Sequence, residues 1–298
     1  MSIEHAVVTI MVDNQADQGL VSEHGLAMLI ETPEQRILFD TGQSPALNAN
    51  APKLGIDLKR VQALILSHGH YDHTGGIPHV LQCNPEMEIF CHPGVVLPRY
   101  AVRNGVARPI HMPHEAMAAL NKIPEPRMRW ISRSIQISRD IGLTGPIPRE
   151  APLEDTGGPF FLDEHAQRRD VIEDDMAIWL NTPRGLVICT GCCHAGLINT
   201  LTYIQRLSGV AAIRAVIGGF HLLQADPERI RWTASSLKSF SPKMIVPCHC
   251  TGAKATDALA EEFGERLRPG YAGLRLTFRP IGKNRPTSLK RILSNNHP

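Results

Sequence analysis

The chain has 298 residues, a net charge of +2 and 43% hydrophobic residues. That length suits one large α/β domain, and the small net charge argues against nucleic acid as a partner. No apolar run approaches the roughly 18 residues that a membrane span needs. The seven cysteines are an odd number and suggest reduced thiols. We therefore expect a single cytoplasmic domain over residues 1–298, with no nucleic-acid or membrane partner, and the oligomeric state stays open.

The first part of the chain predicts strands followed by a helix. Runs rich in β-branched and apolar residues alternate with short polar segments that contain Gly or Pro. Ser44 and Pro45 suit the N-cap and the first position of a helix. We predict strands over 3–11, 26–31 and 36–39, a loop over 13–24 and a helix over 44–54.

The stretch SHGHYDHTGG, residues 67–76, follows an apolar run and is the most informative part of the sequence. It holds His68, His70, Asp72 and His73, an order that chance gives on the order of once in a thousand such sequences. In an extended segment His68 and His70 share one face. The turn that follows lets Asp72 and His73 approach from a second direction. Imidazole and carboxylate together suit zinc, iron or manganese, so we interpret this stretch as a metal site.

This motif, with Asp40 in LFDTG upstream, resembles the signature of the metallo-β-lactamase superfamily. The resemblance implies an α/β fold, an αββα sandwich with the metal at one edge between two sheets. It also implies that Asp40 braces the metal-binding loop through hydrogen bonds.

Further motifs resemble one subgroup of that superfamily, often described as similar to an archaeal dihydropterin ribofuranosylaminobenzene-phosphate synthase. They run from about residue 11 to residue 252 and so cover most of the chain. They are MVDN, SEHGL, ILFDTGQS, TGPIPRE, DDMAI, TGCCHAG, GGFHL and PCHCTG.

The middle of the chain, about residues 93–170, loses regular periodicity and follows a short strand predicted at 88–90. We interpret it as an irregular, partly helical insertion that covers the site. From Arg99 to Arg149 it has eight Arg and one Lys against three acidic residues. Guanidinium groups bind phosphate or carboxylate, so a small anionic substrate is expected. An ordinary solvated basic surface is the alternative.

The second half repeats one pattern three times, in which a predicted strand ends near a histidine and a helix follows. Ligands in layered α/β folds gather at strand ends, so the recurrence points to His194, His221 and His249. We predict strands over 176–180, 186–190, 215–218, 244–247 and 274–279, helices over 197–207, 226–240 and 256–268, and a basic tail.

The superfamily resemblance gives each of these histidines an expected place. His194 would complete the first metal site with His68 and His70, and His249 would join Asp72 and His73 at a second. His221 stands where the family usually has an aspartate that bridges two metals. Imidazole cannot bridge as a carboxylate does, so one firmly bound zinc with a weak or absent second ion is expected. Whether His221 ligates or binds substrate stays open.

Several neighbouring side chains have two interpretations each. Cys192, Cys193, Cys248 and Cys250 flank the predicted ligands, but neither CC nor CHC is a four-ligand zinc pattern, so buried packing thiols are favoured over zinc-thiolate. His24 lies in a loop near the expected site mouth and either touches substrate or is solvated. His92 follows a strand and either faces the cleft or closes a turn.

The residues together favour a metal-dependent hydrolase. Zinc, with iron or manganese as alternatives, would convert water to hydroxide near pH 7. Asp72 would orient that water and take its proton. The substrate would be an anionic ester, lactone or phosphoester. Two alternatives are a transferase that joins dihydropterinylmethyl diphosphate to ribofuranosylaminobenzene phosphate, and a metabolite sensor without turnover.

Overall fold

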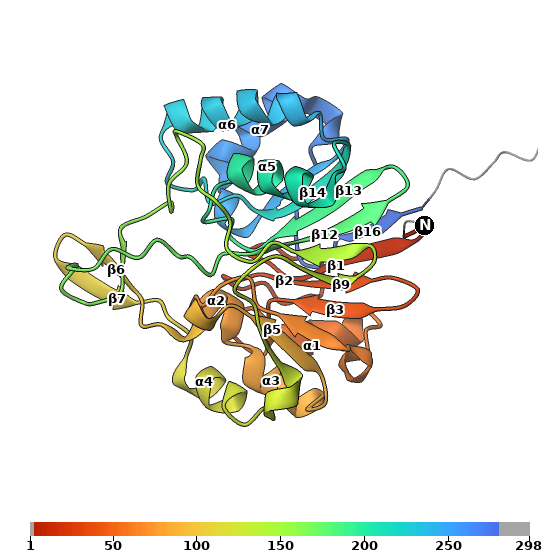
Figure 1. Cartoon of the computed structure of the whole chain (residues 1–298), viewed down its shortest axis with the longest axis vertical. Coiled ribbons are helices and arrows are strands. Elements are labelled where there is room, and N and C mark those ends of the chain that lie inside the picture. Colours follow the sequence, from red (N-terminus) through yellow and green to blue (C-terminus); the bar gives the residue numbers. More distant parts are fainter. Residues whose placement is uncertain (1–2, 280–298) are drawn as a thin grey trace, which may run out of the picture.

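Two β-sheets lie face to face, and helices cover the outer side of each (Figure 1). This computed structural model describes residues 3–279. The order of layers is helix, sheet, sheet, helix, which is the αββα sandwich that the motifs implied.

The first sheet has seven strands and carries its helices on the lower side in Figure 1. Strand β1, second from one edge of this sheet, is buried along its whole length, because it is covered by the second sheet on one face and by α1 on the other. Its sequence AVVTIMV is accordingly a continuous apolar run rather than an alternating one. In sheet order the strands are β16 (Arg275–Phe278), β1 (Ala6–Val12), β2 (Ala27–Glu31), β3 (Arg36–Phe39), β4 (Ala63–Ile65), β5 (Glu88–Cys91) and β8 (Met128–Trp130), and the helices are α1 (Ala46–Lys53), α3 (Ile77–Cys83) and α4 (His114–Leu120).

The second sheet has six strands, and its helices lie on the upper side in Figure 1. Strands β13, β14 and β15 run parallel, so their carboxyl ends meet at one edge. In sheet order the strands are β15 (Ile245–Cys248), β14 (Ile213–Gly219), β13 (Gly185–Thr190), β12 (Ala177–Thr182), β10 (Ile141–Leu143) and β9 (Ile135–Ser138), and the helices are α5 (Leu197–Ser208), α6 (Pro227–Phe240) and α7 (Ala253–Phe263).

The stretch over 93–170 is divided among several layers and differs from the single insertion expected from the sequence. Strands β8, β9 and β10 extend the two main sheets, and α4 joins the outer layer of the first sheet. These segments were missed because a buried triplet such as β10 is too short to show a period. Only β6 (Tyr100–Arg103), β7 (Val106–Pro109) and β11 (Phe160–Phe161) form a separate small sheet, which projects to the left in Figure 1.

Element boundaries differ from the sequence predictions by a few residues. Helix α1 begins at Ala46, and the Ser44 hydroxyl accepts a hydrogen bond from the Ala46 amide at 3.2 Å. Helix α7 begins at Ala253, three residues before the predicted start. The basic tail predicted after residue 279 lies outside the described residues. No helix within residues 3–279 combines the length and hydropathy needed to cross a bilayer.

Candidate metal centre

The predicted ligands converge at one edge, where the loop after β4 meets the loops after β13 and β15. His68 and His70 come from the first sheet, and the short helix α2 (Tyr71–Thr74) follows them. His194 and His249 come from the second sheet and are buried beside them. Residues far apart in sequence therefore form one cluster between the sheets.

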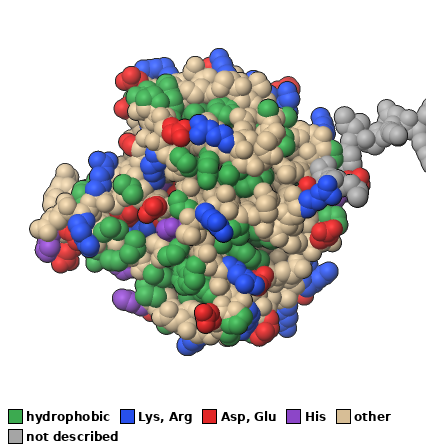
Figure 2. Space-filling model, viewed as in Figure 1, with side chains coloured by type: hydrophobic (Ala, Val, Ile, Leu, Met, Phe, Trp, Pro, Cys, Tyr) green, Lys and Arg blue, Asp and Glu red, His purple; other side chains and the backbone are tan. Residues whose placement is uncertain are grey.

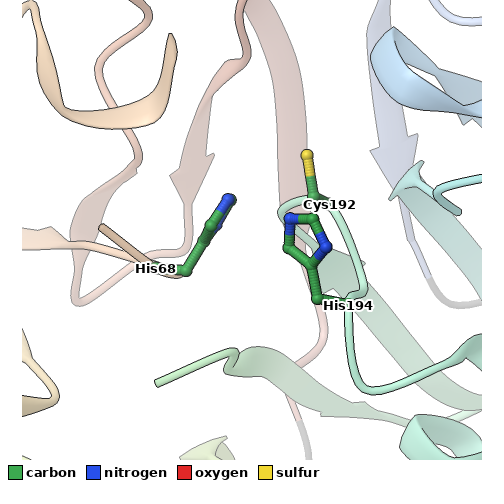
Figure 3. Close-up of side chains that lie close together, drawn as sticks. All are labelled: His68, Cys192 and His194. Carbon is green, nitrogen blue, oxygen red and sulfur yellow. The ribbon is translucent and has the colours of Figure 1, made fainter. Parts of the chain in front are cut away.

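The first group of imidazoles is His68, His70 and His194. The ring of His194 lies 4.8 Å from the rings of both His68 and His70, measured between centroids. His68 Nε2 and His70 Nδ1 are 3.0 Å apart. Figure 3 shows His68 on one side and His194, with Cys192, on the other. Within residues 3–279, Nε2 of both His70 and His194 is buried without a hydrogen-bond partner.

The second group is Asp72, His73 and His249. The Nε2 atoms of the two imidazoles are 3.2 Å apart. Oδ2 of Asp72 lies 3.3 Å from Nε2 of His249 and 3.9 Å from Nε2 of His73. One carboxylate oxygen and two ring nitrogens thus point at a common centre.

The outer nitrogens of three site imidazoles donate hydrogen bonds to oxygen acceptors. His73 Nδ1 bonds to Asp40 at 2.7 Å, His194 Nδ1 to the Thr156 carbonyl at 2.8 Å, and His249 Nδ1 to the Asn14 amide oxygen at 2.9 Å. A proton on Nδ1 leaves the lone pair on Nε2, which faces the cluster. The side chains are therefore in the tautomer that binds a cation.

Asp40 has the position that the family resemblance gave it. Its backbone φ is 62°, and its side chain accepts from the Ser67 amide at 2.7 Å and the Ser67 hydroxyl at 2.6 Å. With its bond to His73, this carboxylate holds the loop at two points.

The charges of the second group complement one another. Burial lowers the pKa of His73, but the carboxylates of Asp40 and Asp72 outweigh it and raise that pKa to about 9. Burial alone would raise the pKa of Asp72, whereas His73, His24 and His249 hold it well below its usual value. Asp72 is thus an anion beside a His73 ring that carries a second proton when no cation is bound. A divalent cation held there would replace that proton.

In the first group the imidazole pKa values are lowered, in contrast to that of His73 in the second group. Burial, followed by repulsion from neighbouring imidazoles, holds the pKa values of His68 and His194 well below the usual value. Their rings are therefore neutral, as metal ligands must be. The unpartnered nitrogens and neutral rings together fit a bound metal ion.

His24, His92 and His221 have three different environments. His24 Nε2 lies 3.1 Å from Asp72 Oδ2, and its side chain is 48% exposed, so it stands at the mouth of the site. His92 accepts a hydrogen bond from the Gly94 amide at 3.0 Å and caps a 3-10 helix, the turn role rather than the cleft role. His221 lies against the first group, with its ring centroid 4.1 Å from that of His194.

Cys192, for which the sequence favoured a packing role over a zinc-thiolate role, lies inside the cluster. Its Sγ lies 3.1 Å from His73 Nε2, and its thiol also groups with His68 and His194. The available signal was its position two residues after the end of β13. The neighbouring Cys193, in contrast, turns away from the cluster, and its Sγ lies 3.4 Å from the Thr200 hydroxyl oxygen.

A buried acidic pair also supports the site. The Asp174 carboxylate accepts from the Gly69 amide at 2.8 Å, and Asp175 accepts from the Ala195 amide at 2.7 Å. The DDMAI motif contained this pair, but a hydrogen bond across 105 residues has no local sequence signal.

Two arginines of the basic stretch stabilise loops. Arg99 is buried and pairs with Asp174 and Asp170, and Arg149 donates to the carbonyls of His194 and Ile172. The face in Figure 2 shows Lys and Arg side chains spread apart rather than gathered in one patch.

Three comparisons with known proteins agree with this geometry. The model of the metallo-β-lactamase superfamily matches residues 22–167. A 7,8-dihydropterin-6-methyl-4-(β-D-ribofuranosyl)-aminobenzene-5'-phosphate synthase of Methanocaldococcus jannaschii is 35% identical over 275 residues, covering 86% of this chain and 90% of the relative.

Solved structures extend the comparison. Tm1679, described as a metal-dependent hydrolase of the β-lactamase superfamily, aligns with a TM-score of 0.78 and 30% identity over 91% of this chain and 98% of its own. Zn²⁺-bound PqqB from Methylobacterium extorquens shares the fold with a TM-score of 0.55 and 11% identity, over 91% of this chain and 99% of its own. Motif, layered fold and relatives agree, and the chain belongs to the metallo-β-lactamase superfamily.

Proposed function

We propose that this protein is a metal-dependent hydrolase that acts on a small anionic ester, lactone or phosphoester. The observation that carries the proposal is the convergence of the ring nitrogens of His73 and His249 with the Asp72 carboxylate, next to the neutral imidazoles of His68 and His194. Asp72 in turn contacts half-exposed His24, so the centre has an open side through which a substrate can approach.

The metal would be zinc, with iron or manganese compatible with the same ligands. Such an ion acts as a Lewis acid and lowers the pKa of water to about 7. The side chains that would hold it are His68, His70 and His194 in the first group, and Asp72, His73 and His249 in the second.

The protein's own groups would position the reactants. Asp72 is ionised and buried, so its carboxylate can accept a hydrogen bond from the attacking water and hold that water in place. His24 donates to the Asp72 carboxylate at 3.1 Å and fixes its orientation. Phe160, whose ring lies 5.4 Å from that of His70, helps to exclude bulk water.

A transferase reaction is the second candidate, and one specific finding favours it. The relative that is 35% identical is a synthase of a dihydropterin aminobenzene phosphate. In that reaction Asp72 would not activate water. The same cluster would stabilise the charge of a departing diphosphate.

An activity screen separates the two candidates. The metal-loaded protein is assayed with p-nitrophenyl esters and phosphodiesters, and metal content is measured on the same samples. Hydrolysis predicts p-nitrophenol release that falls about 100-fold to 10,000-fold in Asp72→Asn while the ion held by His68, His70 and His194 is retained. His92→Asn keeps a capping acceptor and serves as the matched control that retains activity.

Other outcomes would contradict the hydrolase proposal. Release of diphosphate only when dihydropterinylmethyl diphosphate and ribofuranosylaminobenzene phosphate are both present would establish transfer. Tight metabolite binding without any product would indicate a sensor.

A further inference from the structure

We infer that the thiolate of Cys192 is a shared ligand of the two groups, bridging two metal ions in place of the carboxylate that the family usually supplies. The inference concerns how the metal is held and does not depend on which reaction the centre performs.

The position of the sulfur carries the inference. Cys192 Sγ lies 3.1 Å from Nε2 of His73 in the second group. Its sulfur and one ring nitrogen each of His68 and His194 also lie within 4.8 Å of one another, and the same holds for the sulfur with His73 and His249. Figure 3 shows the first of these two sets. Cys192 is therefore common to both groups, as a bridging ligand must be.

The neighbouring nitrogens support a ligand role. The side chain of His194 is fully buried, and within the described residues its Nε2 has no hydrogen-bond partner. Its other ring nitrogen is held by the Thr156 carbonyl, so this lone pair cannot turn away. Cys192 itself is only 2% exposed. A cation between them would satisfy both atoms.

Two glycines bring the cysteine to this point. A Cβ on Gly191 would lie 2.1 Å from Ser67 Oγ, and one on Gly219 would lie 2.6 Å from the Gly191 carbonyl oxygen. The chain after β13 therefore packs directly against the Ser67 side chain of the metal-binding loop on one side and against Gly219 at the end of β14 on the other. A larger residue at either glycine would push Cys192 away from the centre.

A thiolate has the properties that a bridging ligand between the two groups needs. A thiolate has several lone pairs and carries the negative charge that a neutral imidazole lacks, and soft thiolate ligands suit zinc and cobalt(II). His221 lies against His194 and groups with Cys192 and Cys250 rather than with both halves of the centre. Cys250 likewise shares only that one group among the described residues, so it cannot join the two halves.

Cobalt(II) titration of the metal-free full-length protein tests the inference. Thiolate–cobalt bonds give a charge-transfer absorption in the near ultraviolet. We expect this band to grow through two equivalents of cobalt in the wild-type protein. Cys192→Ser should lose the band and bind the second ion more weakly, whereas Cys192→Asp should lose the band but keep two ions.

Variants of the neighbouring cysteines show which sulfur atom gives the cobalt band. Cys193→Ser changes the adjacent buried thiol, which faces Thr200, and should keep the full band. The inference is overturned if the band survives in Cys192→Ser or disappears in Cys250→Ser alone. It is also overturned if the band saturates at one equivalent, because the sulfur would then bind a single ion. Circular dichroism of each variant confirms that it is folded.

Discussion

At the scale of single residues, Asp40 positions more than one group. It accepts bonds from the Ser67 amide, the Ser67 hydroxyl and His73, and it is fully buried. The bond to His73 fixes which ring nitrogen faces the cluster. Asp40 would thus act on a bound metal through its neighbours and not by direct contact.

Replacing Asp40 should therefore weaken metal binding without removing a ligand. We expect Asp40→Asn to lower the affinity for zinc about 10-fold to 100-fold, because His73 loses its anionic partner. Competition with a chromophoric chelator measures the affinity. Asp57→Asn, at the cap of a surface 3-10 helix, is the control and should leave it unchanged. Equal affinities of Asp40→Asn and wild type would contradict this role.

Arg99 contributes to stability through buried ion pairs. Its guanidinium forms an ion pair with Asp170 at 2.8 Å and donates a hydrogen bond to Asp174 at 2.8 Å, and its side chain is 1% exposed. Arg99→Ala leaves two buried carboxylates unpaired and should lower the free energy of unfolding by about 3–5 kcal/mol.

A surface pair provides the comparison. Arg129 bonds to Glu88 at 2.8 Å but is 52% exposed, so Arg129→Ala should change that free energy by about 1 kcal/mol or less. Urea denaturation of the metal-free proteins measures both changes. Similar losses in the two variants would show that burial of the Arg99 pairs does not matter.

Glu154 should make stability depend on pH. It accepts from the Ile198 and Asn199 amides at the start of α5, and burial raises its pKa above 4.5 despite these bonds. Between the unfolded and folded pKa values the folded protein binds more protons, so the free energy of unfolding falls as pH rises through that window. Below the unfolded pKa this loss is absent.

The variant Glu154→Gln removes the titrating group. Its free energy of unfolding, measured by urea denaturation at a series of pH values, should not show the fall with rising pH that Glu154 causes in the wild-type protein. Glu34→Gln changes a carboxylate on an exposed turn and is the matched control. If the free energy of unfolding changed with pH in the same way in the wild type and in Glu154→Gln, Glu154 would not be the source of the pH dependence.

At the scale of elements, the loops after the strands carry the chemistry, and the helices behind them hold those loops in place. Helix α6 begins directly after the loop that holds His221. Asp226 is its N-cap, and its carboxylate accepts from the Arg229 amide at 2.8 Å. Pro227 occupies the first helical position, where a missing N–H costs nothing.

Loss of this cap should be measurable as a stability change. Asp226→Ala leaves an amide of the first turn without its acceptor and should lower the free energy of unfolding by about 1 kcal/mol. Asp226→Asn retains an acceptor oxygen and should cost less. Thermal and urea denaturation compare the three proteins, and an Asp226→Asn loss as large as that of Asp226→Ala would argue against capping.

At the scale of the whole molecule, the proposed ligands join the two halves of the sandwich. His68, His70 and His73 follow a strand of the first sheet, and His194 and His249 follow strands of the second. A metal ion bound by both sets links the two sheets at one edge. Folding and metal binding should therefore be coupled.

Removal of metal should lower thermal stability. With free zinc at 100 times its dissociation constant, binding stabilises the folded state by about 2.7 kcal/mol. Calorimetry with and without a chelator should show a lower Tm for the metal-free protein. His68→Ala combined with His194→Ala should remove the response to zinc. A Tm that is unaffected by the chelator in the wild-type protein would contradict the coupling.

Much of the fold and site could be predicted from local patterns. The spacing of His68, His70, Asp72 and His73 identifies the metal-binding loop, because ligand type and strand period are properties of a short segment. The motifs also implied the sandwich and the repeated order of strand, histidine and helix, both of which the structure shows. The helix cap at Asp226 followed from residue types alone.

Tertiary structure alone decided which side chains meet. His73 contacts His249 across 176 positions, and Cys192 lies 119 positions from His73. No periodicity records such separations, so the sequence could not place Cys192 beside His73 or show that Arg99 pairs with Asp170 and Asp174. Local sequence determines which groups a segment offers and on which face. Which of those groups converge depends on how the two sheets pack, and that is a property of the whole chain.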